Sequence, residues 1–225
     1  ARMVRSARAA APDMVVISDN CFCEYTDHGH CGVVHGDEVL NDPTLANLQR
    51  QAVTAARAGV DMLAPSGMMD GMIRAMRAGL DAEGFTHIPI MSYSTKFASA
   101  FYGPFRDAVD SSFKGTRSAY QMDFCNAREA LAESLQDEAE GADILMVKPG
   151  LAYLDVVASV RAHSERPVAV YQVSGEYAMM KAAVAAGVME ERALVMETLM
   201  AFRRAGADLI LTYFAEDAAR WLREG

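Results

Sequence analysis

The sequence lacks the features that mark membrane, secreted and nucleic-acid-binding proteins. No apolar run approaches the roughly 20 residues needed to cross a bilayer, and the start of the sequence has no apolar core like that of a signal peptide. Basic residues are in the minority, with 21 Lys and Arg against 30 Asp and Glu and a net charge of −9. Phosphate binding needs a clustered basic face, so this balance argues against nucleic acid and against anionic membranes. We therefore expect a cytoplasmic protein whose partner is a small molecule.

Glycine-rich nucleotide-binding motifs are also absent, because no GxGxxG or P-loop pattern follows any predicted strand. Cysteine is scarce, with four residues in the chain. In a reducing cytoplasm these thiols are expected to bind a metal or take part in catalysis rather than to form a disulfide framework. The sequence therefore directs attention to the three clustered cysteines, and we interpret the fourth, Cys125, as structural.

Six short apolar runs have the length and the β-branched content of buried strands, and helical stretches separate them. Three of the runs are introduced by a glycine followed two residues later by an aspartate, which is typical of a helix that stops at glycine and feeds a buried strand. These introductions lie at 59–61, 141–143 and 206–208. The six predicted strands are 14–18, 60–64, 88–93, 143–147, 168–173 and 208–212.

Strand and helix alternate, which indicates an α/β fold with a parallel sheet, either a doubly wound sheet or a (β/α)8 TIM barrel. An open sheet concentrates its site at one switch point, whereas a barrel brings the carboxyl ends of all its strands together. Chemically unusual side chains follow almost every predicted strand, which favours the barrel, here as one domain over 1–225. These side chains are Asp19, Cys21, Ser66, Lys96, Lys148, Ser174 and Tyr213.

The segment 97–126 has no clear helical or strand period and is too long for an ordinary connection, which is typical of a functional lid. It combines aromatic residues with arginines, among them Tyr102, Phe105, Arg106 and Arg117. Because arginine binds carboxylates through paired hydrogen bonds, we predict an active-site lid that binds a carboxylate. The alternative interpretation is an excursion that only packs its aromatic side chains on the barrel.

Cys21, Cys23 and Cys31 place three thiols within eleven residues after a strand end. Three protein ligands leave a fourth tetrahedral position open for water or substrate, as in catalytic zinc sites. A redox pair and inert buried thiols are the alternatives. The first is disfavoured because cysteines two residues apart form strained disulfides, and the second because three clustered thiols rarely lack a function. Nearby histidines are alternative ligands that could close the site instead. These are His28, His30 and His35.

Lys96 and Lys148 each end an apolar strand, where an ordinary lysine would be costly to bury. For either one alone, a surface lysine with a buried stem is an equally good interpretation. Two such lysines favour a function. If both face one cavity, burial and mutual repulsion lower their pKa values, and a neutral amine can attack a ketone to form a Schiff base.

Several motifs occur in one order along essentially the whole chain, and together they are specific. They lie at 21–31, 64–66, 93–97, 101–106, 146–149 and 173–176. On these motifs the sequence resembles the porphobilinogen synthases. The resemblance implies a TIM-barrel hydro-lyase of tetrapyrrole and haem biosynthesis that condenses two 5-aminolevulinate molecules to porphobilinogen with loss of two waters.

The resemblance also implies a role for each matched residue. Lys148 would bind the first 5-aminolevulinate and Lys96 the second, both as Schiff bases. Asp19 and Ser66 match positions that contact the amino ends of the substrates. The remaining matched positions bind the two substrate carboxylates or close the lid. They are Ser174 and Tyr213 for the first carboxylate, Arg106, Arg117 and Gln121 for the second, and Tyr102 and Phe105 for the lid.

Two metals follow from the resemblance. Zinc on Cys21, Cys23 and Cys31 would polarise the second substrate or a bound water, and this chain resembles the zinc-using members, since others replace the cysteines with acids. Glu133 matches a position that holds an allosteric magnesium in some relatives, and a solvated carboxylate on an acidic helix is the alternative interpretation.

The chain departs from the family pattern at two places. Gly67 and Met72 stand where the family usually has Asp and Arg, so two charges beside the site are missing, and these losses would cancel if the two charges were paired. The family's N-terminal arm, which embraces a neighbour in the octamer, and its first two strands do not appear, so we expect six consecutive parallel strands with unpaired edges. A homo-oligomer is still implied.

Two other functions remain open at this stage. One is a catalytically silent zinc-binding barrel of the same fold, which the changes at Gly67 and Met72 would fit. The other is a Schiff-base lyase of the class I aldolase type. That alternative ranks lower, because a lone aldolase would not need a second lysine at a strand end or three clustered cysteines.

Overall fold

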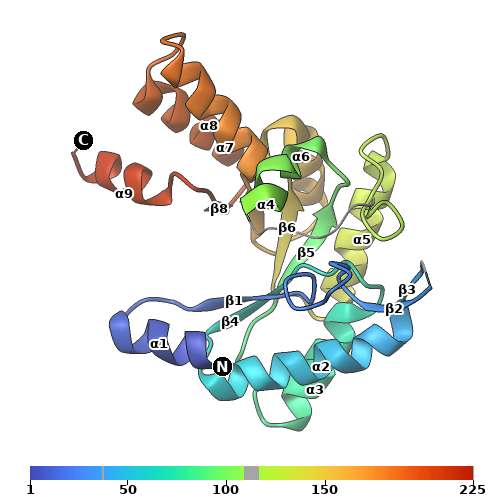
Figure 1. Cartoon of the computed structure of the whole chain (residues 1–225). Coiled ribbons are helices and arrows are strands. Elements are labelled where there is room, and N and C mark those ends of the chain that lie inside the picture. The colour runs from blue at the N-terminus through green and yellow to red at the C-terminus, as the bar shows by residue number, and fades with distance from the viewer. Residues whose placement is uncertain (37, 109–116, 225) are drawn as a thin grey trace.

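The fold is built on parallel strands that follow one another along the chain. A computed structural model describes residues 1–36, 38–108 and 117–224. Within these residues, β1 pairs with β4, and β5, β6, β7 and β8 pair in that order, all in parallel. A parallel bridge from Leu63 to Ile90 links the two groups. Figure 1 shows the strands with the helices around them. The strands are β1 (Ile17–Asn20), β4 (Met62–Pro65), β5 (Met91–Lys96), β6 (Ile144–Lys148), β7 (Val168–Tyr171) and β8 (Leu209–Leu211).

Helices separate successive strands, which confirms the predicted α/β barrel architecture. No helix among the described residues is both long and apolar enough to span a membrane. The α-helices are α1 (Arg2–Ala10), α2 (Asn41–Ala58), α3 (Met72–Ala82), α4 (Gly103–Ala108), α5 (Ala127–Glu140), α6 (Leu154–His163), α7 (Ser174–Ala185), α8 (Glu191–Ala205) and α9 (Ala215–Glu224). Two short 3-10 helices, η1 (Ala100–Tyr102) and η2 (Leu151–Tyr153), follow β5 and β6.

The predicted strands are correct in number and order but not in their limits. Most begin one to three residues later than the apolar runs, because residues such as Val60 are buried between helix and sheet before strand pairing starts. Several also extend into polar residues, since pairing continues through Asp19 and Lys96. A small antiparallel hairpin, β2 (Val33–His35) with β3 (Glu38–Leu40), was not predicted, and its strands are too short to show a period.

The three Gly-x-Asp introductions form the same structure each time. The glycine takes a left-handed backbone conformation that ends the helix. The aspartate carboxylate accepts a hydrogen bond from a backbone N–H entering the neighbouring strand at 2.7–3.0 Å, and the aspartate N–H donates to the carbonyl of that same residue at 2.7–2.9 Å. The reciprocal pairs are Asp61 with Val16, Asp143 with Ile90, and Asp208 with Val168.

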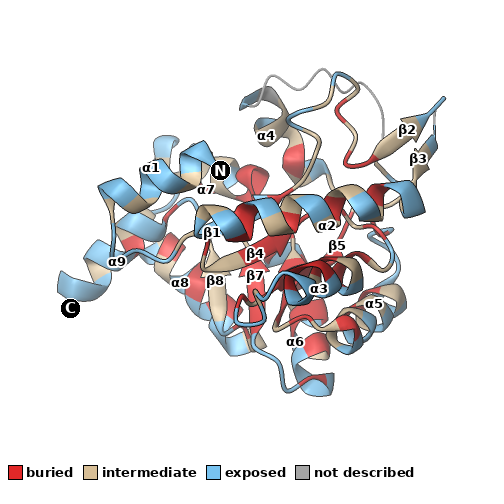
Figure 2. Ribbon diagram, turned by 90° about the horizontal axis from the view of Figure 1, so that it is seen from below, coloured by how far each residue is buried: buried red, intermediate tan, exposed pale blue. Residues whose placement is uncertain are grey.

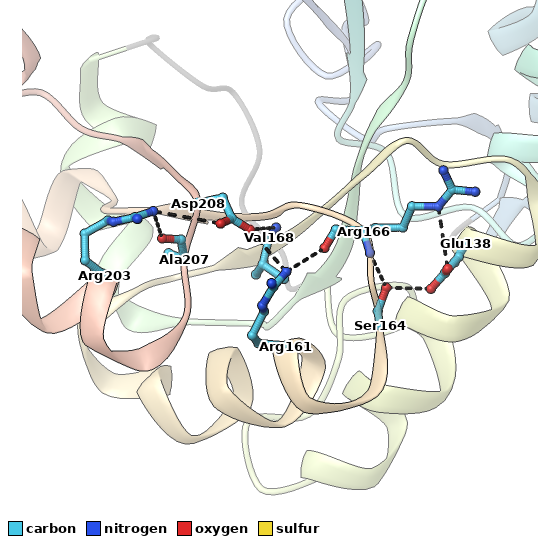
Figure 3. Close-up of polar contacts among 8 residues, drawn as sticks. All are labelled: Glu138, Arg161, Ser164, Arg166, Val168, Arg203, Ala207 and Asp208. Carbon is cyan, nitrogen blue, oxygen red and sulfur yellow. Dashed lines mark hydrogen bonds and ion pairs between the residues drawn. The ribbon is translucent and has the colours of Figure 1, made fainter.

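Figure 3 shows the third of these pairs within a wider polar network at the amino ends of the strands. Arg161 and Arg203 both approach the Asp208 carboxylate, at 3.4 and 3.9 Å. Next to them, Glu138 accepts a hydrogen bond from Ser164 at 2.6 Å and pairs with Arg166 at 3.5 Å. The contacts join α5, α6 and α8 to this end of the sheet, which leaves the opposite end for the polar side chains that follow the strands.

The core has two parts. A small inner cluster lies among the strands, and a larger cluster fills the space between strands and helices. Figure 2 shows buried residues concentrated in the central strands and on the helix faces turned toward them, whereas α1 and α9 are mostly exposed. The inner cluster consists of Ala64, Met91, Tyr93, Ile144, Met146 and Ala169.

Candidate active site

Lys96 and Lys148 lie side by side at the carboxyl ends of two neighbouring strands. They are the last residues of β5 and β6, and they stand opposite each other in the parallel register of these strands. Both amines approach the ring of Tyr93, with Nζ 5.6 Å from the ring centroid for Lys96 and 5.1 Å for Lys148. Because opposed residues of paired strands point to the same face, both side chains enter one pocket.

The Lys148 amine lies in a predominantly aromatic environment. Its Nζ is 4.0 Å from the ring centroid of Tyr171 and 5.6 Å from that of Tyr102. Burial, followed by the positive charge of Lys96, lowers the pKa of Lys148 to about 7. A large fraction of this amine is therefore neutral, and nucleophilic, near neutral pH.

The Lys96 amine is buried and hydrogen-bonded. Its Nζ donates to the carbonyl of Ser66 at 2.7 Å, and the side chain is 6% exposed. The hydroxyl of Ser66 in turn donates to the Asp19 carboxylate at 2.7 Å. Burial raises the pKa of the Asp19 carboxyl above its ordinary value, against the effect of the Ser66 hydrogen bond. Asp19, Ser66 and Lys96 thus form one polar chain that ends in an amine.

Most of the site residues predicted from the sequence meet in two adjoining cavities that share Lys96 and Lys148. Asp19, Cys21 and Ser66 line one of them. Cys23 lines both. The other cavity contains Tyr102, Arg106, Gln121, Ser174 and Tyr213, together with Phe105 and Arg117, which line both.

Two anion-binding features lie within the pocket. The first consists of Arg106 and Arg117, which both line the pocket, and Arg117 also donates to the Gly29 carbonyl at 2.9 Å. Ser174, the first residue of α7, lies at the amino end of this helix, where backbone N–H groups and the helix dipole favour negative charge. The Ser174 hydroxyl accepts a hydrogen bond from the Phe105 N–H at 3.0 Å.

Tyr93 and Tyr171 contact the amines but were not predicted as site residues. A signal for both was present in the sequence: each is a tyrosine within or ending a predicted apolar strand. Tyr93 lies three residues before Lys96, and simple alternation would put these two residues on opposite faces. Their shared face therefore requires an irregularity in β5, which the register of that strand shows.

The three predicted metal ligands form one cluster. The Sγ atoms of Cys21, Cys23 and Cys31 all lie within 4.8 Å of one another, with 3.3 Å between the first two, and the cysteines are free thiols. Tetrahedral zinc with Zn–S bonds near 2.3 Å needs sulfurs about 3.8 Å apart, so the cluster fits such an ion. Hydrogen bonds from Cys21 and Cys23 lower the pKa of the Cys31 thiol, whereas the pKa values of Cys21 and Cys23 themselves are raised, so Cys31 is the readiest thiolate and the other two would lose their protons on binding a metal.

The histidines do not join the metal cluster in the part of the chain that the structure describes. His30 instead approaches the Tyr120 hydroxyl through Nδ1 at 3.2 Å, and His28 Nδ1 accepts the backbone N–H of His30 at 3.1 Å. His35 lies in β2 of the hairpin. The alternative in which a histidine closes the site is therefore not supported by this geometry.

Gly67 and Met72 are neighbours in space. A Cβ atom at position 67 would lie 3.7 Å from the Met72 Sδ and 3.7 Å from the Cys31 carbonyl. Met72 is 2% exposed and belongs to the large core cluster. The two positions are thus near enough for opposite charges there to pair, which is the condition under which the two changes would cancel.

Glu133 lies on α5, away from the lysine pocket. It lines a separate cavity together with the acidic residues Asp70, Glu129 and Asp137. Burial and the neighbouring carboxylates, Asp70 first among them, raise the pKa of Glu133. Glu133 thus lies among other acidic residues and is partly buried, which differs from a fully solvated carboxylate. The arrangement does not identify an ion.

The segment 97–126 contributes to the pocket through its described parts. These supply Tyr102 and Phe105 before the gap and Arg117 and Gln121 after it. Residues 109–116 lie outside the described residues. The Tyr102 hydroxyl donates to the Lys148 carbonyl at 3.4 Å, which ties this segment to the end of β6.

A family model, curated relatives and a solved structure all match the chain, and all three belong to one enzyme family. A family model described as delta-aminolevulinic acid dehydratase matches residues 1–221. The delta-aminolevulinic acid dehydratase of Escherichia coli strain K12 is 58% identical over 219 residues, which are 97% of this chain and 68% of that protein. That of Halalkalibacterium halodurans is 55% identical over 222 residues, covering 98% of this chain and 68% of that protein.

A solved structure of the Toxoplasma gondii enzyme, porphobilinogen synthase in complex with its product porphobilinogen, superposes with a TM-score of 0.97 at 50% identity. The match covers 99% of this chain and 64% of that one, so the chain spans about two thirds of the length of its relatives. The level of identity and the extent of the match lead to one conclusion: the chain belongs to the delta-aminolevulinic acid dehydratase, or porphobilinogen synthase, family.

Proposed function

We propose that the protein condenses two 5-aminolevulinate molecules to porphobilinogen, with Lys148 and Lys96 each holding one substrate as a Schiff base. The observation that carries this proposal is the register of β5 and β6, which places two buried or half-buried amines opposite each other at the mouth of one pocket. A reaction that joins two copies of one keto acid needs two such amines in reach of each other.

Lys148 is the better nucleophile for the first substrate. Its neutral amine attacks the ketone carbon to give a carbinolamine, and loss of one water leaves the imine bonded to Nζ. The rings of Tyr93, Tyr102 and Tyr171 surround this nitrogen, and their negative faces favour the protonated, positively charged form of the imine.

Lys96 is proposed to bind the second substrate. Its amine is held by the Ser66 carbonyl, and the neighbouring Asp19 carboxylate is placed to bind the amino group of a substrate or to accept a proton from it. Burial raises the pKa of Asp19, which makes this carboxylate a stronger base than an exposed one.

The two substrate carboxylates are assigned to the two anion-binding features of the pocket. We assign Ser174, at the amino end of α7, and Tyr213, which follows β8, to the first substrate. Arg106, Arg117 and Gln121 are assigned to the second. The arrangement of one barrel domain over 1–225 with a lid over 97–126 stays a prediction, as do the homo-oligomer, the cytoplasmic location and magnesium at Glu133.

We further infer that the cysteine cluster holds zinc, because three thiolate ligands suit zinc better than magnesium or calcium. When bound, zinc with an open fourth position supplies a Lewis acid beside the pocket. Cys23 lines both cavities, so the ion would lie next to the second substrate.

Protein purified without chelator is expected to contain about one zinc per chain. Cys23→Ser removes one thiolate, and we expect it to weaken zinc affinity by at least about 100-fold, since a hard hydroxyl replaces a soft ligand. Metal analysis and competition with a chromophoric chelator measure both, independently of activity. Cys125→Ser, at an exposed cysteine, is the matched control and should bind zinc like the unaltered protein. Unchanged affinity in Cys23→Ser contradicts the assignment.

The pH dependence of labelling tests the Lys148 environment. Because the pKa of Lys148 is lowered to about 7, its neutral fraction rises as the pH increases through 7. Labelling with 5-aminolevulinate and cyanoborohydride should therefore reach half of its plateau near pH 7 at this lysine. Lys181, whose pKa the Glu191 carboxylate raises, is an internal control in the same molecules and should be labelled only at much higher pH. Parallel curves for the two lysines contradict the assignment.

Product analysis tests the proposed function itself. Purified protein incubated with 5-aminolevulinate should form porphobilinogen, more rapidly with zinc than after its removal. A protein that binds zinc but forms no adduct and no pyrrole is the silent barrel considered above. A product formed by cleaving or joining other carbonyl compounds would identify a lyase of the aldolase type.

A further inference from the structure

A β-bulge in β5 determines where Lys96 points. Opposite β6, Ser92 stands against Leu145 and Thr95 against Val147, so two residues of β5 face a single residue of β6. An extra residue in one strand bends that strand and re-aims the side chains that follow it. The bulge lies directly before Lys96, the residue that the proposed reaction needs inside the pocket.

The faces of β5 change at this bulge. Met91 and Tyr93 belong to the inner cluster among the strands, so regular alternation would place Thr95 inside and Lys96 outside. The structure has the reverse order. Thr95 points toward α5, where its hydroxyl donates to the Ala130 carbonyl at 3.0 Å, and Lys96 lines the pocket.

One buried hydroxyl on α5 contacts both Ser94, which regular alternation already places on the outer face, and Thr95, which the bulge turns onto that face. The Ser134 Oγ lies 2.8 Å from the Thr95 Oγ1 and 3.2 Å from the Ser94 Oγ. The Ser94 Oγ also lies 3.5 Å from the Met146 carbonyl oxygen, opposite the bulge. Ser134 and Thr95 are 0% exposed and Ser94 is 2% exposed, so water does not compete for these hydrogen bonds.

In a regular strand, two successive side chains point to opposite faces of the sheet, so a single side chain on a covering helix cannot form hydrogen bonds with both. A serine that binds the hydroxyls of both Ser94 and Thr95 therefore stabilises the bulged strand over the regular one. We propose that Ser134 is a positioning residue, which holds this bulge and thereby directs the Lys96 amine into the pocket. The inference rests on the proposed function only in giving Lys96 a substrate to bind.

The test measures the reactivity of Lys96 without requiring turnover. Protein at neutral pH is reductively methylated with limiting formaldehyde and cyanoborohydride, and peptide mass spectrometry gives the ratio of label at Lys96 to label at Lys148. Ser134→Ala is expected to lower this ratio by about 5-fold, the size of effect that one buried hydrogen bond of about 1 kcal/mol produces. Lys148, on the regular strand β6, serves as the internal reference.

Matched variants separate positioning from general destabilisation. Thr95→Val keeps the shape of the side chain but loses the hydroxyl, and should lower the ratio as Ser134→Ala does, whereas Thr95→Ser keeps the hydroxyl and should not. Thr198→Val removes a buried hydroxyl on α8 that donates to the Leu194 carbonyl, and should leave the ratio unchanged.

The possible results separate the two claims. A ratio unchanged in both Ser134→Ala and Thr95→Val, or lowered equally by Thr198→Val, overturns the positioning role. In one outcome, the unaltered protein forms no pyrrole while the ratio of Lys96 to Lys148 label is still lower in Ser134→Ala than in the unaltered protein. In that case the proposed function fails and the positioning role stands. Should Ser134→Ala not fold, the comparison of Thr95→Val with Thr95→Ser decides alone.

Discussion

Replacing Lys148 by Met is expected to lower the rate of porphobilinogen formation by at least about 10³-fold, because the nucleophile of the first covalent step is lost. Met has a similar length and no charge, so the aromatic surroundings of Tyr93, Tyr102 and Tyr171 can accommodate it. Initial rates measured by a colour reaction for the pyrrole, with 5-aminolevulinate in excess, give the result.

The folded state should not suffer from this change. The pKa of Lys148 in the folded protein, about 7, lies below its ordinary value of 10.5. Burying the charged amine therefore lowers the stability of the fold by its full amount below about pH 7, and this loss diminishes to zero as the pH rises from about 7 to 10.5. Lys148→Met should therefore be at least as stable as the unaltered protein at pH 7. Lys181→Met, at an exposed lysine paired with Glu191, is the control and should retain full activity. An active, folded Lys148→Met protein contradicts the mechanism.

Glu176→Ala is expected to cause a large loss of stability, about 3–5 kcal/mol of unfolding free energy. The Glu176 carboxylate is 1% exposed and accepts backbone hydrogen bonds from Gly150 at 3.2 Å, Leu151 at 2.5 Å and Val173 at 2.6 Å. Removing it leaves three backbone donors without this acceptor, two of them, on Gly150 and Val173, in buried hydrogen bonds. Gly150 and Leu151 belong to the loop that directly follows Lys148, so denaturant unfolding and Lys148 labelling should both change.

An exposed carboxylate provides the matched control. Glu190 caps α8 by accepting the backbone N–H groups of Arg192 and Ala193, at 3.0 and 2.6 Å. Because water can replace this acceptor, Glu190→Ala should cost far less stability than Glu176→Ala. Equal losses in the two variants would show that burial of the Glu176 contacts has no special weight.

The sequence was sufficient to predict the alternation of strands and helices, the polar ends of the strands and the three-thiol cluster. These features are local: each depends on a short apolar run, a glycine stop or closely spaced cysteines. The adjacency of the strand ends that carry Lys96 and Lys148 also followed, because the carboxyl ends of successive parallel strands adjoin.

What could not be predicted depends on contacts distant in the chain. The bulge that turns Lys96 inward is set by Ser134, which lies 39 residues beyond Thr95 and 40 beyond Ser94, so no local pattern reveals it. The aromatic surroundings of Lys148 include Tyr171 from the next strand. Strand limits also differed, because an apolar residue is equally suited to the sheet and to the space beneath a helix.

The central claim is that both strand-end lysines form imines with the same substrate. Zinc-loaded protein is incubated with 5-aminolevulinate and reduced with borohydride, and peptide mass spectrometry locates every lysine adduct. The account predicts adducts on Lys148 and on Lys96, with Lys181 unlabelled. Label confined to other lysines, or no label in protein shown to be folded, would contradict it.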